Sequence, residues 1–117
     1  MTFELNGIQY KIVELDQKEY KKIRLEQDEA KGVEKSKVEE GMYYGASHYD
    51  ECKIYLDKDM PQDRKRKVLI HELAHCYIYE YITHADYNLT QEEVADLVAN
   101  SYDIIGNIIN DYFMPSL

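Results

Sequence analysis

Apolar and polar positions alternate near the start of the chain, on both sides of an Asn-Gly pair. The segment Phe3–Leu15 alternates around Asn6-Gly7. Alternation is typical of a strand with one buried face, and Asn-Gly favours a two-residue hairpin turn because both of its residues tolerate a positive φ. The pattern predicts a hairpin with strands at about 2–5 and 8–14. A single bent strand with a bulge at Gly7 is the alternative.

A second alternating segment follows a stretch that is dense in charge. This charge-dense stretch is residues 16–41. Its composition predicts a solvent-exposed helix over about 16–31 and then a flexible loop. Residues 52–57 alternate again, which predicts a half-buried strand, and residues 42–49 are expected to be its hairpin partner.

Helical spacing dominates the remainder of the chain. Pro61 suits the first turn of a helix, and the apolar residues that follow predict a helix over about 61–82. After a loop at 83–89, a last helix is predicted from Thr90 to about Phe113. Its apolar stripe follows the helical period and consists of Val94, Leu97, Val98, Ser101, Ile105, Ile108 and Tyr112. These elements predict an α+β fold, in which a small antiparallel sheet packs against two helices.

Length and composition fit one domain over residues 1–117 and restrict its partners. The net charge of −9 argues against nucleic acid and anionic membrane surfaces, since both require a basic footprint. No apolar run approaches the ~18 residues of a membrane span, and the first residues do not resemble a signal peptide. We therefore expect a cytoplasmic protein in which Cys52 and Cys76 are reduced thiols.

Residues 71–75 carry the candidate chemistry, because they read His-Glu-Leu-Ala-His. Two histidines four positions apart lie about 40° apart on a helix, so both imidazoles can reach one metal ion. Glu72 projects to the side of the pair and would reach the metal through a bound water, as a general base requires. Apolar neighbours predict that the imidazoles are buried and need a partner. Two surface histidines without a metal are the alternative.

Other residues near the motif have predicted roles outside metal binding. Cys76 is expected to turn into the core, as Cys52 is from the strand. Further candidates for stabilising an oxyanion are His48, His84, Tyr87 and Tyr102.

A third metal ligand is expected from the last helix. Glu92 follows His75 by 17 positions (92 − 75). Asp96 lies one turn after Glu92, where a carboxylate can accept the free N–H of a ligating histidine. Ala95 and Ala99 would let this helix approach the motif helix closely.

Glu93 is the alternative third ligand, because it lies closer to the apolar stripe than Glu92 does. The residues Thr90-x-x-Glu93 also form a capping-box pattern, which would give Glu93 a structural role at the start of the helix. The spacing leaves both residues open as ligands.

The motif HELAH, followed by Glu92-x-x-Ala95-Asp96-x-x-Ala99, resembles the gluzincin pattern of the ImmA/IrrE-type metallopeptidases, in a minimal form of the kind carried by phages and mobile elements. The resemblance covers about residues 50–105. It implies a zinc-dependent endopeptidase that cuts a repressor or other regulatory protein, with Zn²⁺ on His71, His75 and Glu92 and with Glu72 as the general base. A non-catalytic protein-interaction module that keeps a metal is the alternative function.

Overall fold

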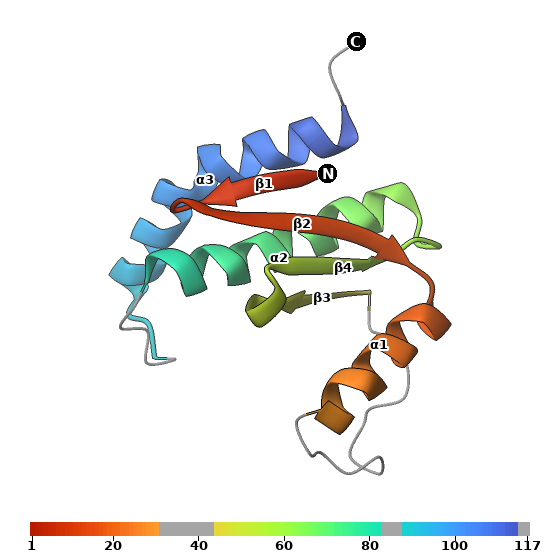
Figure 1. Ribbon diagram of the computed structural model, residues 1–117. Helices are drawn as coiled ribbons and strands as arrows, with labels where there is room; N and C mark the ends of the chain where they lie inside the picture. Colours follow the sequence, from red (N-terminus) through yellow and green to blue (C-terminus); the bar gives the residue numbers. More distant parts are fainter. Residues whose placement is uncertain (31–43, 83–87, 115–117) are drawn as a thin grey trace.

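The structure, a computed structural model, describes residues 1–30, 44–82 and 88–114, without the side chains of 27–30. Its centre is a four-stranded sheet in the order β1-β2-β4-β3 (Figure 1). The strands are β1 (Thr2–Leu5), β2 (Ile8–Leu15), β3 (Gly45–His48) and β4 (Lys53–Asp57). The α-helices of the described residues are α1 (Gln17–Ala30), α2 (Gln62–Tyr81) and α3 (Gln91–Phe113), and a short 3-10 turn, η2 (Tyr49–Glu51), precedes β4. The predicted α+β class is confirmed.

The Asn-Gly pair forms the predicted hairpin turn. Asn6 has a φ of 49° and Gly7 a φ of 80°, so both residues lie in the left-handed region that a two-residue turn of this kind requires. β1 and β2 pair antiparallel, with Phe3 opposite Tyr10, and the two rings stack at 5.4 Å between centroids. The hairpin is confirmed and the single bent strand is wrong.

One pairing in the centre of the sheet differs from the predicted antiparallel arrangement. β3 and β4 pair antiparallel, as expected, but β2 and β4 run parallel, with Ile12 opposite Ile54. A short turn forces neighbouring strands to be antiparallel, whereas β2 and β3 are separated by α1 and the residues after it. The β3–β4 pair can therefore add to β2 in either direction, and the alternation of residues does not specify which.

The main core lies between one face of the sheet and the helices α2 and α3. β1 and β2 contribute alternate residues to this core, and α2 contributes one side of its surface. The fully or nearly buried members are Phe3, Leu5, Tyr10, Ile12, Ile54, Leu56, Leu69, Leu73, Cys76, Ile105, Ile108 and Ile109. Cys52 packs against this core from its position just before β4, as predicted.

The first half of α1 packs against part of the opposite face of the sheet. Tyr20 of α1 is buried against Leu15 and Tyr55. Because of this second layer, three successive residues of β4 (Ile54, Tyr55 and Leu56) are buried, and the prediction of a half-buried strand is wrong. α1 forms where it was expected, but it is anchored by Tyr20 and is not simply solvent-exposed.

Only the second half of α3 joins the core. Ile105, Ile108 and Ile109 are buried there, whereas Val94 and Val98 are 43% and 58% exposed. The predicted stripe is therefore correct for the C-terminal half of the helix and wrong for its beginning. Ala95 and Ala99 are exposed as well, so the predicted close approach to α2 at these two alanines is wrong.

Among the described residues, no helix is both long and apolar enough to cross a bilayer. The cytoplasmic location and the lack of a nucleic-acid partner stay predictions from the composition.

A partly buried ion pair fixes the first half of α2 to the sheet. Lys65 is only 8% exposed, and its Nζ donates to Oε1 of Glu14 at 2.6 Å. The hydroxyl of Tyr112, on α3, donates to the other oxygen of Glu14. Partial burial acts to raise the pKa of Glu14, but the hydrogen bonds from Lys65 and Tyr112 outweigh it and hold this pKa below its usual range. Glu14 thus joins β2, α2 and α3.

We expect Glu14→Gln to lower the free energy of unfolding at pH 7 by about 1–2 kcal/mol, because Lys65 loses its charged partner. The folded pKa of Glu14 is depressed, so its contribution is present above pH 4.5, the value for the unfolded chain, and is lost as the pH falls through the folded pKa. Denaturant unfolding of both proteins across this pH range measures the difference. Glu4→Gln, at an exposed carboxylate of β1, is the control and should change little. A stability difference independent of pH would contradict the assignment.

Candidate metal centre

The helical period of α2 divides the histidine motif between the core and the surface. Leu69 and Leu73 are fully buried, and His71 and His75 each lie two positions further, about 200° round the helix, on its exposed side. Glu72 lies between these directions and is only 7% exposed. The prediction that the imidazoles are buried is therefore wrong, and the buried titratable group of the motif is Glu72.

The two imidazoles are close enough to act together. Nε2 of His71 and Nε2 of His75 are 3.1 Å apart, and the ring planes meet at 77°. At this distance the two nitrogens either share a proton or bind one cation. Two nitrogens that ligate a tetrahedral zinc at about 2.0–2.1 Å are themselves about 3.3 Å apart. The pair therefore fits two adjacent ligand positions of a zinc ion.

Glu72 is held between α2 and the edge strand β3. Ser47 Oγ lies 3.1 Å from Glu72 Oε2 and 3.3 Å from the backbone oxygen of Glu72, so the hydroxyl can donate to either. The hydrogen bond to Oε2 orients a buried carboxylate that also borders an open groove. Glu72 therefore has a fixed orientation beside the histidine pair, as a positioned base requires.

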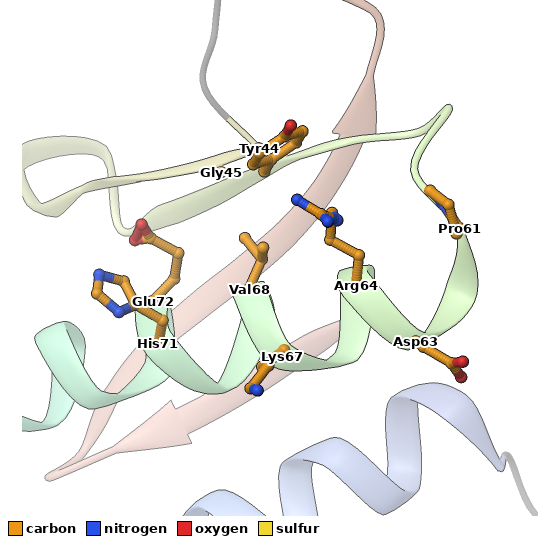
Figure 2. Close-up of a pocket in the computed structure, with 9 residues that line it drawn as sticks. All are labelled: Tyr44, Gly45, Pro61, Asp63, Arg64, Lys67, Val68, His71 and Glu72. Carbon is orange, nitrogen blue, oxygen red and sulfur yellow. The ribbon is translucent and has the colours of Figure 1, made fainter.

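A groove of about 900 Å³ extends along α2 from this site. His71 and Glu72 stand at one end and Pro61 at the other, with β3 forming the upper wall in Figure 2. Its size lies at the upper end of the range for ligand pockets. The lining residues are Tyr44, Gly45, Pro61, Asp63, Arg64, Lys67, Val68, His71 and Glu72.

The described part of the chain does not bring a third ligand to His71 and His75. No further His, Cys, Asp or Glu of residues 1–30, 44–82 and 88–114 completes a group of three around them. Glu92 and Asp96 are both exposed near the start of α3. The structure thus brings His71 and His75 together, with Glu72 next to them on α2, and among the described residues it does not bring Glu92 to them.

The predicted capping box at the start of α3 is confirmed. Oε1 of Glu93 accepts a hydrogen bond from the backbone N–H of Thr90 at 3.2 Å, and Oγ1 of Thr90 accepts one from the N–H of Glu93 at 3.1 Å. The carboxylate of Glu93 is therefore occupied at the helix start. Glu92 forms no hydrogen bond or ion pair with the described residues and keeps its carboxylate available.

The candidates His48 and Tyr102, which the structure describes, do not join the site. His48 accepts or donates a hydrogen bond with the Tyr20 hydroxyl at 2.9 Å, toward α1, and Tyr102 is 74% exposed. His84 and Tyr87 lie outside the described residues.

Both cysteines are free, as predicted. Cys76 is fully buried, and this burial raises the pKa of its thiol to about 12, so the thiol stays protonated at neutral pH. A protonated thiol in the core is consistent with the predicted packing role.

Gly45 and Ser47 belong to the site, although the motif and its spacing did not indicate them. They are two positions apart on β3, so the alternation of a strand places both on the face that meets α2. The alternation is visible in the sequence, but the helix that covers that face is not.

Comparison of the chain with protein-family models, with curated proteins and with solved structures finds no match. The interpretation of the site therefore depends on the geometry of His71, Glu72 and His75.

Gly45 permits the close contact between β3 and α2. A Cβ at this position would lie 2.7 Å from Cγ1 of Val68 and 3.3 Å from Cγ of Glu72. We expect Gly45→Ala to lower the free energy of unfolding by about 1–3 kcal/mol, the range for overpacking. Gly106→Ala, in α3, is the matched control. Its Cβ would meet nothing within 4 Å, so stability should be unchanged or raised by up to about 1 kcal/mol. Equal effects in thermal unfolding would contradict the proposed close contact.

Proposed function

We propose that the protein is a zinc-dependent endopeptidase that cuts a protein substrate, such as a repressor or other regulatory protein. The observation that carries the proposal is the pair of Nε2 atoms of His71 and His75, 3.1 Å apart, beside the buried carboxylate of Glu72 at one end of a groove. Two imidazoles on one helix face and a separate carboxylate are what a catalytic zinc site needs from a single helix.

In peptide hydrolysis, Glu72 and Ser47 would have separate roles beside the metal ion. A bound zinc ion would supply Lewis acidity for the peptide carbonyl and would lower the pKa of water. Glu72 would take the proton from the attacking water at a carboxylate oxygen and pass it to the amine nitrogen that leaves. Ser47 would keep Glu72 oriented through its hydrogen bond to Oε2.

The edge of the sheet supplies a place for an extended substrate. β3 is the last strand in the sheet order, so among the described strands only β4 pairs with it. An extended peptide could add to its outer edge through main-chain hydrogen bonds. Since β3 also forms a wall of the groove through Gly45, such a peptide would pass the histidine pair.

Glu92 completes the proposed zinc site as its third ligand. Its carboxylate is exposed and free of hydrogen bonds to the described residues, whereas that of Glu93 is used in the capping box. From Gln91 to Asn100 no side chain of α3 is buried, so few packing contacts determine where this part of the helix lies. Asp96, one turn after Glu92, is proposed to accept the free N–H of a ligating histidine.

The purified protein should bind about one zinc per chain, measured by elemental analysis and by a thermal shift on adding zinc. His71→Ala and His75→Ala should each lose the metal, and Glu72→Gln should keep it but lose cleavage of a peptide library followed by mass spectrometry. His48→Gln is the control, because His48 is hydrogen-bonded toward α1, and this variant should keep the metal.

Two results would reject parts of this proposal. A wild-type protein without affinity for zinc would reject the metal site. Zinc binding without any cleavage by the wild type would favour the non-catalytic, metal-containing interaction module.

Glu92→Ala should weaken zinc binding strongly, because two histidines and water make a poorer site than two histidines and a carboxylate. Asp96→Ala should weaken it by roughly 10–100-fold. Glu93→Ala should leave the zinc affinity unchanged and cost about 1 kcal/mol of stability through loss of the cap. Competition with a chromogenic chelator measures the three affinities. If the Glu93 variant loses zinc and the Glu92 variant keeps it, Glu93 is the ligand.

A further inference from the structure

Part of the groove is basic, although the whole chain has a net charge of −9. Away from His71 and Glu72, its charged lining residues are Asp63, Arg64 and Lys67. Figure 2 shows the side chains of Asp63 and Lys67 on the side of α2 that is away from Tyr44 and the strand wall, whereas that of Arg64 points toward Tyr44. Arg64 is therefore the cation that faces the strand wall, and Lys67 lies at the border of the groove, four positions after Asp63 on the same side of α2.

Arg64 is held in place within the groove. Its guanidinium carbon lies 5.0 Å from the centre of the Tyr44 ring, which faces it from the strand wall (Figure 2). Stacking on an aromatic ring restrains a guanidinium and leaves the N–H groups at its edge able to bind a carboxylate through two hydrogen bonds. The arginine is thus positioned before any ligand arrives.

Neither cation of the groove is neutralised within the described part of the chain. Arg64 and Lys67 form no ion pair with residues of that part. Lys65, between them in sequence, is instead buried and paired with Glu14. The two groove cations therefore remain available to a ligand.

The spacing along α2 relates the cations to the histidine pair. Arg64 precedes His71 by seven positions (71 − 64), which is about 10 Å along a helix and within about 20° of the same direction. Lys67 precedes His71 by four positions (71 − 67), about 6 Å. An extended peptide advances by about 3.3 Å per residue. The cations therefore lie about two to three peptide residues from the histidine pair.

We propose that this basic half of the groove selects substrates with an acidic side chain, Asp or Glu, two or three residues to one side of the bond that is cut. The inference rests on the proposed peptidase function. Arg64 would bind the carboxylate through paired N–H donors, and Lys67 would add a second positive charge at the border of the groove. An acidic peptide would otherwise be repelled by a chain of this net charge, so the local cations decide its binding.

Binding of defined peptides tests this inference without requiring cleavage. The probes are capped eight-residue peptides of Ala and Thr, fluorescently labelled, in which Glu, Gln or Lys occupies each position in turn. In zinc-containing buffer, the Glu72→Gln protein should bind the Glu peptide about tenfold more tightly than the Gln peptide at one preferred position, because a hydrogen bond to a charged group is worth about that factor. Fluorescence anisotropy measures the dissociation constants.

Three variants in the same background assign the preference to the groove. Arg64→Gln should remove most of it, and the double variant Arg64→Glu, Lys67→Glu should favour the Lys peptide. Arg66→Gln is the matched control, because Arg66 is an exposed cation on the same helix that does not line the groove. Equal binding of Glu and Gln peptides, or an equal loss of preference in the Arg66 variant, would overturn the inference.

Cleavage of the same peptides by the unaltered protein separates this inference from the proposed function. Charge-selective binding without cleavage would keep the acidic preference of the groove and reject the peptidase. Cleavage with no preference for Glu would keep the peptidase and overturn the acidic preference. Failure of every peptide to bind would also overturn it.

Discussion

The packing of α2 against β3 and β4 is the constraint on which the rest of the structure depends. Leu69 and Leu73 must face the sheet to complete the core, and this fixes the rotation of the helix about its axis. The same rotation turns His71 outward and brings Glu72 against Ser47. A different rotation would bury imidazoles among apolar residues, where each would need a polar partner. The core thus determines how the candidate site is presented.

Polar contacts fix α2 along its length and restrain the motif between its ends. Near its beginning, Lys65 is paired with Glu14 of β2. Near its end, Tyr10 donates to Oε1 of Glu80 at 2.5 Å, and burial together with Glu80 raises the pKa of this tyrosine, so its hydroxyl stays a donor. Groups that must keep a defined geometry are best placed on an element that is held at both ends.

The proposed site and the proposed substrate preference share one side of α2. Arg64 and His71 point in nearly the same direction, two turns apart, so a peptide along β3 would meet both. The position of the third proposed ligand, Glu92, is determined differently. Glu92 belongs to the half of α3 that buries no side chain, and the core therefore does not determine its position as it determines those of His71 and Glu72.

The sequence by itself determined features that depend on residues within about one helical turn of each other. Asn6-Gly7 specified the hairpin, Thr90 and Glu93 specified a helix start, and a spacing of four brought two imidazoles together. Only the tertiary structure decided that β2 and β4 run parallel, that Glu72 is the buried member of its motif, and that the beginning of α3 is exposed. The reason is that burial depends on which distant segment covers a face. Alternation and helical period show that a face is apolar, but they do not show what packs on it.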